Sequence, residues 1–246
     1  MKQLGLNIII LLVIIQYSCE KNSPECFVSK GKIIKEQRPL TEFNNIRITD
    51  IFDLVLVQDS LNNIVLEGGK NLLPNVTTDI KNDTLIINNS TKCCWLRDYD
   101  KIKLYIHFTN IEHLVTYDPV SVISYDTVRS EHFEYYAIGE IGEADLILNC
   151  NYFRFDDSHN TLGHFKFRGK TDYSRFYINY GSSLYADSLI SIKTDILYQT
   201  IGDIYVHVKE HLRVWILGPG NVYYSGDPDL VETVEKRSTG TLIRAD

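Results

Sequence analysis

A short phrase that recurs about every 20 residues is the feature that most constrains the fold of this chain. Its clearest copy is the segment 217–228, LGPGNVYYSGDP, in which a Gly-rich turn leads into a short strand and a second turn. Weaker copies precede it at intervals of 21, 21, 19, 20 and 18 residues, if one turn position is taken from each copy: Ser121, Gly142, Gly163, Ser182, Gly202 and Gly220. A regular period of this length predicts stacked coils.

Strand-forming residues flank each of these turns, as in Phe176–Ile178 before one turn and Ala144–Leu148 after another. A single coil cannot bury its apolar face, but stacked coils shield one another, and each buried side chain contributes about 1.5–3 kcal/mol. Glycine suits the corners because the chain turns there with positive φ or neighbouring backbones approach closely. We therefore predict an all-β, right-handed parallel β-helix, or β-solenoid. An antiparallel sandwich is the competing fold, but it does not explain the period.

Composition agrees with this fold class and excludes one class of partner. The chain has 16 Tyr, 10 Phe and one Met, which favours strands over helices. The net charge is −7 and the Lys and Arg residues are scattered, so no basic face for nucleic acid is expected. Strand patterns begin at residue 31. We expect one domain over 31–246, with N-terminal strands in 31–112 and repeat coils in 113–246.

The N-terminus predicts export from the cytoplasm. Residues 1–18 hold a positive charge and the apolar run Ile8–Ile15, which is too short to span a bilayer, and they end on Ser18. Cys19 follows directly, as at a lipoprotein cleavage site, so it becomes a lipidated first residue, followed by a polar tether over 19–30. We expect a protein anchored in a membrane by lipid, at the outer membrane, in the periplasm or on the cell surface. The alternative is a soluble secreted protein with an ordinary thiol at Cys19.

Four further cysteines, an even number, suit an oxidising compartment. A disulfide between Cys26 and Cys93 would close a loop of nearly seventy residues and stabilise the fold by about 4 kcal/mol. Cys94 and Cys150 pair with each other or stay free. Because no CxxC pair is present, neither a structural zinc site nor another cofactor is predicted.

Several segments resemble one known family. Phe43–Ile46, 52–58 (FDLVLVQ), 71–73 (NLL) and 83–87 (DTLII) are similar to the N-terminal half of the "putative auto-transporter adhesin, head GIN domain" family, and Gly218–Asn221 resembles its Gly-Ser-Gly-Asn turn. The family occurs mainly in lipoproteins and secreted proteins of Bacteroidota and has no settled activity. The resemblance covers most of the chain from residue 31 and implies a fold, an exported location and, by name, adhesion.

The same resemblance bears on the cysteines. A subgroup of the family carries one cysteine at the position of Cys26 and one at that of Cys93, with a polar residue usual at that of Cys94. It therefore implies a disulfide between Cys26 and Cys93.

Aromatic residues recur at related places in successive coils and are the first candidate for a binding surface. Exposed aromatic rows suit sugar rings, which present apolar CH faces to a π surface. We take Tyr205, Trp215 and Tyr223 as a possible ligand face. The alternative is that these rings serve packing, because Tyr and Trp are good strand formers.

The segment 156–159 (DDSH) and His164 form the densest group of titratable residues. A metal or acid–base site would need convergent groups from other coils, and a polar turn explains the segment equally well. We therefore predict no catalytic and no metal site. The alternative function is a β-helix enzyme that acts on acidic polysaccharide, with four suspect residues: Asp156, Asp157, Asp172 and Arg175.

A three-residue phrase of Asp, Ser or Thr and an apolar residue occurs four times. It resembles the O-glycosylation signal of exported Bacteroidota proteins, and it also describes a turn that enters a strand. The candidate acceptors are Ser60, Thr84, Thr127 and Ser188.

These observations predict a non-enzymatic cell-envelope lipoprotein that acts as an adhesin or a glycan- or protein-binding module. The enzyme above is one alternative, and an envelope protein with a purely structural role is another. The sequence leaves the oligomeric state open.

Overall fold

The computed structural model describes residues 29–90, 101–117, 119–157 and 161–245. The predicted signal segment, Cys19, the Cys26–Cys93 pair and Cys94 lie outside these residues. Within them, no helix has the length and apolar character needed to cross a membrane. One short 3-10 helix, η2 (Leu73–Asn75), accompanies a 17-stranded sheet.

The strands fall into short and long ones. The short strands are β1 (Ile33–Pro39), β2 (Asn45–Ile48), β3 (Phe52–Gln58), β4 (Asn63–Gly69), β5 (Val76–Lys81), β6 (Thr84–Asn89), β7 (Ile102–Phe108), β8 (His113–Thr116), β9 (Val120–Ser124), β15 (Val222–Ser225), β16 (Leu230–Lys236) and β17 (Leu242–Arg244). The long strands are β10 (Val128–Ala137), β11 (Ile141–Asp156), β12 (Leu162–Tyr180), β13 (Ser183–Thr200) and β14 (Ile204–Ile216).

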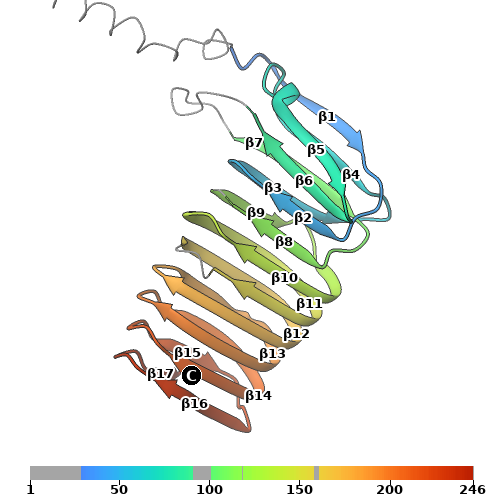
Figure 1. Ribbon diagram of the computed structural model, residues 1–246. Coiled ribbons are helices and arrows are strands. Elements are labelled where there is room, and N and C mark those ends of the chain that lie inside the picture. Colours follow the sequence, from blue (N-terminus) through green and yellow to red (C-terminus); the bar gives the residue numbers. More distant parts are fainter. Residues whose placement is uncertain (1–28, 91–100, 118, 158–160, 246) are drawn as a thin grey trace, which may run out of the picture.

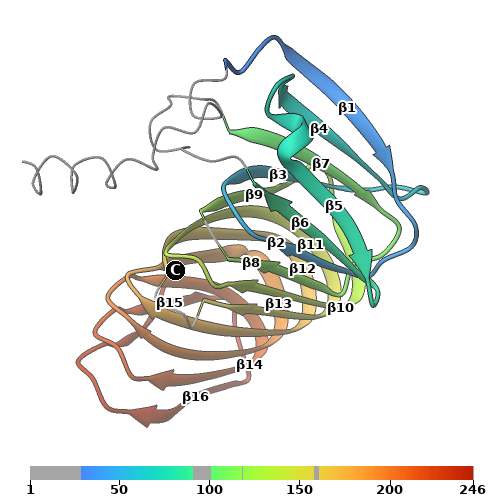
Figure 2. The ribbon, with the colours of Figure 1, turned by 45° about the horizontal axis from the view of Figure 1, so that its top comes forward.

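The strands pair in two ladders that run the length of an elongated molecule (Figure 1). The first ladder follows the order β5–β6–β2–β8–β10–β11–β12–β13–β14–β16. The second ladder follows the order β1–β4–β7–β3–β9–β11–β12–β13–β14–β15–β17. Strands β11 to β14 belong to both ladders because each bends around a corner of its coil (Figure 2). The predicted parallel β-solenoid is confirmed.

The N-terminal half also forms coils, but these do not stack in chain order. Strands β2 and β3 lie in the stack between the β6–β7 pair and the β8–β9 pair, although they precede both pairs in the sequence. Leu54 is therefore registered with both Leu104 and Val122. Strands β1, β4 and β5 pair antiparallel and cover this end of the stack. Coils therefore occur in the region 31–112 as well as in 113–246.

A column of small residues marks one corner of the coils, as the sequence period predicts. Gly142 is registered with Gly163, and a methyl group added to Gly220 would lie 2.1 Å from the carbonyl oxygen of Gly202. These glycines have no positive φ, so close backbone approach is the reason for glycine here. The turn position predicted at Ser121 is shifted by one residue. Val120, not Ser121, is registered with Gly142.

The core fills the space between the two ladders with large side chains. Phe155 is 0% exposed, and its ring centroid lies 4.4 Å from that of Phe165 and 5.3 Å from that of Tyr135. Cys150 is buried and has no disulfide partner among the described residues, and Cys94 lies outside them. Burial raises the pKa of the Cys150 thiol to about 11, which keeps it protonated and unreactive.

Candidate functional site

Two tyrosines of the predicted ligand face, Tyr205 and Tyr223, form a stack with Tyr185 on the outer surface of the second ladder. Tyr185, Tyr205 and Tyr223 are registered with one another on β13, β14 and β15. The ring centroids are 5.5 Å apart for the first pair and 4.9 Å for the second, with interplanar angles of 6° and 10°. The rings therefore cover each other's faces and leave mainly their edges and hydroxyls to solvent. This geometry suits lateral packing better than a platform for sugar rings.

Trp215 lies on a different surface from these tyrosines. It belongs to the part of β14 beyond the corner and is registered with Leu197, which is registered in turn with Tyr177, all on the first ladder. The expected ligand face of Tyr205, Trp215 and Tyr223 is therefore divided between two faces of the solenoid. The corner inside β14 separates Trp215 from Tyr205. The alternation of residues in the sequence does not show where this corner lies.

A shallow hollow forms on the first ladder because a small side chain stands between two large ones. Leu197 lies between Tyr177 and Trp215 in the stack, and the space above it has a volume of about 60 Å³. The side chains around it combine aromatic, aliphatic and charged groups: Arg175, Phe176, Tyr177, Asp195, Leu197 and Trp215. The sequence pattern did not single out Asp195 and Leu197, which lie one coil after Arg175 and Tyr177.

The polar rim of the hollow is held in place by hydrogen bonds. The Asp195 carboxylate accepts a hydrogen bond from the Tyr173 hydroxyl at 2.6 Å and two from the Arg213 guanidinium at 2.8 and 2.6 Å. The guanidinium of Arg213 also lies 5.7 Å from the ring centroid of Trp215. These contacts fix both the carboxylate and the indole without a ligand.

Arg175 contributes a spare hydrogen-bond donor at the rim of the hollow. Its guanidinium lies 5.4 Å from the ring centroid of Tyr177, and its Nε is 4.0 Å from the Asp195 carboxylate. That Nε is buried and has no hydrogen-bond partner in the described part of the chain. A ligand hydroxyl or carboxylate could accept this hydrogen bond, and an unsatisfied buried donor favours such an acceptor.

A family model described as "Putative auto-transporter adhesin, head GIN domain" matches residues 42–228. The chain belongs to this family. The description supports an adhesin-like role and, with it, a location at the cell surface or envelope. A comparison with curated proteins found no match.

Solved structures share the fold of this head GIN domain at low sequence identity. A putative adhesin from Bacteroides fragilis NCTC 9343 is 19% identical, with a TM-score of 0.79 over 87% of this chain and 97% of that chain. A putative adhesin from Parabacteroides distasonis ATCC 8503 is 16% identical, with a TM-score of 0.68 over 87% and 98% of the two chains. A structure from the same Parabacteroides strain, named a putative lipid binding protein, is 15% identical, with a TM-score of 0.60 over 86% and 97%.

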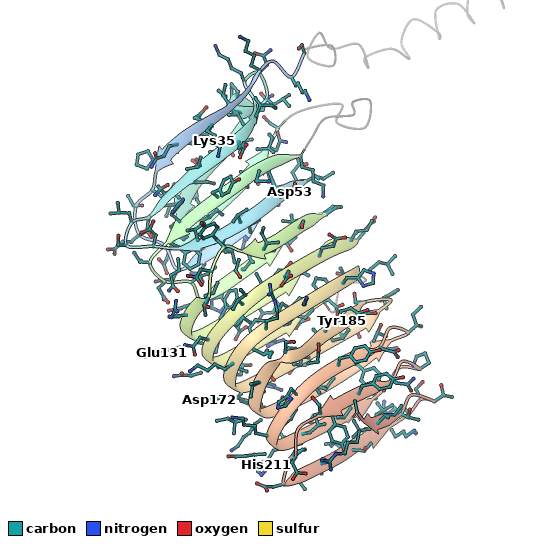
Figure 3. All side chains as sticks on the ribbon, turned by 180° about the vertical axis from the view of Figure 1, so that it is seen from behind. Lys35, Asp53, Glu131, Asp172, Tyr185 and His211 are labelled. Atoms are coloured by element: carbon teal, nitrogen blue, oxygen red, sulfur yellow. The ribbon has the colours of Figure 1, made fainter. Side chains whose placement is uncertain are left out.

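The head GIN domain places the residues suspected of catalysis in separate environments. Asp156 is paired with Arg154 at 2.6 Å, whereas Asp157 is fully buried and accepts a hydrogen bond from the backbone N–H of Asn179 at 2.7 Å. Asp172 lies on the corner edge that also carries Glu131 and His211 (Figure 3). None of these three carboxylates lines the hollow at Arg175.

Buried Asp157 makes the stability of the domain depend on pH. Burial raises the pKa of its carboxyl to about 7, against about 3.9 in an unfolded chain. The folded state therefore holds one more proton than the unfolded state between these values, so stability falls as pH rises from about 4 to 7. The loss is up to about 4 kcal/mol and is complete above the folded pKa.

Asp157→Asn is expected to remove this loss, because the amide keeps an acceptor for Asn179 and never ionises. Urea unfolding at pH 4.5 and pH 8 measures the effect, with the exposed Asp172→Asn as the matched control. The variant should be more stable than the parent protein at pH 8 and show a flatter profile. Equal pH profiles for the Asp157→Asn variant and the parent protein would refute the assignment.

Of the four candidate glycosylation sites, Ser60 and Thr127 lie outside strands and Thr84 begins β6, whereas Ser188 lies inside β13 at an irregularity in its pairing with β14. Ser60 and Ser188 are exposed, while Thr84 and Thr127 are half-buried. In Asp59–Ser60 and in Asp126–Thr127, the Asp carboxylate accepts a hydrogen bond from the backbone N–H of the following residue at 2.6 Å. This hydrogen bond is typical of turns, so it explains the three-residue phrase at these two positions without glycosylation. O-glycosylation stays a prediction for these residues.

Proposed function

We propose that this head GIN domain is a non-enzymatic adhesin of the cell envelope that binds glycans in the hollow between Tyr177 and Trp215. The observation that carries the proposal is the combination of two aromatic walls with the spare donor of Arg175. Glycan recognition needs such a combination, because a sugar ring has apolar CH faces and a polar rim.

The spacing of the strands supports one sugar residue as the unit of recognition. Tyr177 and Trp215 are two strands apart, which corresponds to about 10 Å, and Leu197 forms the floor between them. The edge of one sugar ring fits between the walls, with a hydroxyl or carboxylate directed to Arg175. A hollow of about 60 Å³ buries only part of a ligand, so each contact is weak and adhesion gains strength from many copies on a surface.

The anchoring proposed for this adhesin follows from the N-terminal sequence. Lipidation of Cys19 would hold many copies on one membrane and supply the required multivalency. Expression of the full chain in a Bacteroidota host, followed by mass analysis of the N-terminal peptide, tests this step. We expect acyl chains on Cys19 and loss of membrane attachment in Cys19→Ser. An unmodified Cys19 in membrane-free protein would contradict the anchor and leave the binding proposal intact.

Binding of the purified chain to a glycan array tests the ligand directly. Trp215→Ala and Tyr177→Ala are expected to weaken the best-bound glycan roughly tenfold or more, since each removes one wall. Tyr205→Ala and Tyr223→Ala are the matched controls on the other ladder and should keep the parental affinity. Thermal unfolding of each variant checks that the fold is retained.

Three outcomes would contradict the proposal. One is binding that survives Trp215→Ala, and another is binding lost equally in Tyr205→Ala. The third is the absence of any bound glycan, including the case in which only a protein ligand is captured. Loss of an acidic polysaccharide substrate over time would contradict the non-enzymatic part and favour the enzyme alternative.

A further inference from the structure

Two histidines and a glutamate come together on the outer surface where β8 and β10 pair. His113 on β8 is registered with Glu134 on β10, and His132 lies two residues before Glu134 on the same strand. One potential ligand atom from each of the three residues lies within 4.8 Å of the other two. His113 and Glu134 are half-buried and His132 is exposed, so an ion could reach them from solvent.

A hydrogen-bond relay fixes the tautomer of His113. The side-chain amide of Asn45 donates to the backbone carbonyl of Asp83 at 3.2 Å, which directs its Oδ1 to the other side. That Oδ1 lies 2.7 Å from Nδ1 of His113 and is an acceptor, so Nδ1 carries the proton. The lone pair of His113 is therefore on Nε2. Metal-binding histidines are commonly oriented by an acceptor in this way.

Neighbouring side chains also hold His132 and Glu134 in place. The His132 ring is stacked on the ring of Tyr152, with centroids 4.5 Å apart and an interplanar angle of 18°. Its Nε2 lies 2.7 Å from Oε1 of Glu134, and the other oxygen of Glu134 accepts a hydrogen bond from the Tyr136 hydroxyl. The cluster thus has a supporting group for each of its three members.

We propose that His113, His132 and Glu134 form a zinc-binding site on this face of the solenoid. Two imidazoles and one carboxylate suit Zn²⁺, whereas Ca²⁺ and Mg²⁺ prefer sites made of oxygen ligands alone. On binding, the ion replaces the hydrogen bond between His132 and Glu134, and the proton of neutral His132 resides on Nδ1. Three protein ligands leave the fourth tetrahedral position to water or to an oxygen of a bound molecule.

Calorimetric titration of the full chain with Zn²⁺ alone tests the site, with the solvent-accessible thiols alkylated so that they cannot bind the ion. We expect one Zn²⁺ per chain and at least a tenfold loss of affinity in His132→Gln and in Glu134→Gln. Asn45→Ala removes the acceptor for His113, together with the hydrogen bond that Asn45 donates to Asp83, and is expected to weaken binding roughly tenfold. His164→Gln is the matched control, because His164 is exposed on the second ladder away from the cluster.

Co²⁺ substitution provides an independent readout of the ligands. The bound ion should show tetrahedral d–d absorption without the charge-transfer band of a thiolate ligand. The proposal is overturned if the alkylated chain binds no Zn²⁺, or if His132→Gln and Glu134→Gln bind it as the parent does. Calcium binding of equal strength at the same residues would also overturn the choice of metal.

Discussion

Phe155→Ala is expected to lower the free energy of unfolding by about 3–5 kcal/mol. Phe155 is 0% exposed and is registered with Tyr135 on one side and Phe176 on the other, in the inward column of the first ladder. Truncation removes contacts to both neighbouring coils and to Phe165, and a rigid sheet cannot collapse around the cavity.

Denaturant unfolding followed by circular dichroism measures this change. Tyr125→Ala is the matched control, because its side chain is 77% exposed and its loss should change stability by less than about 0.5 kcal/mol. Equal stabilities of the two variants would contradict the packing described between the ladders.

Gly220→Val is expected to destabilise the fold by about 3 kcal/mol or more, or to prevent folding. A Cβ at this position would lie 2.1 Å from the carbonyl oxygen of Gly202 and 3.1 Å from that of Thr200. Both obstacles are backbone atoms of the adjoining coil, so the strain cannot be relieved by a change of rotamer. The coils would have to separate at this corner.

Gly181→Ala provides the matched control for this prediction. Its added Cβ would meet the end of the Leu162 side chain at 2.5 Å, and Leu162 is 55% exposed and can move away. We expect little change in the denaturation midpoint for Gly181→Ala and a large decrease for Gly220→Val. A small effect of Gly220→Val would show that the coils are not in the close contact described.

The sequence predicts the stacking of coils well because the physical cause is local and repeated. From Gly142 onward, this corner of each coil places a small residue against the backbone of the adjoining coil, so Gly163, Ser182 and Gly202 recur at nearly constant spacing. The insertion of β2 and β3 between other coils has no such signal. It depends on pairings such as Ile46 with Leu85, and any apolar strand of similar length could occupy that place.

The sites are harder to predict because they depend on where a coil bends. The corner inside β14 separates Trp215 from Tyr205, although the sequence there is continuous strand. The hollow at Leu197 arises only because its neighbours in adjoining coils are larger. His113 and Glu134 are one coil apart, so a search at the repeat spacing could have found this pair.

Amide–amide NOEs in the perdeuterated protein test the winding of the coils most directly. Parallel stacking predicts contacts at a constant offset of about one coil, with Ile204 close to both Leu184 and Val222. The same offset should hold along β12, β13 and β14. Hairpins would instead give contacts in which one residue number rises as the other falls, and that result between β12 and β13 would contradict the solenoid.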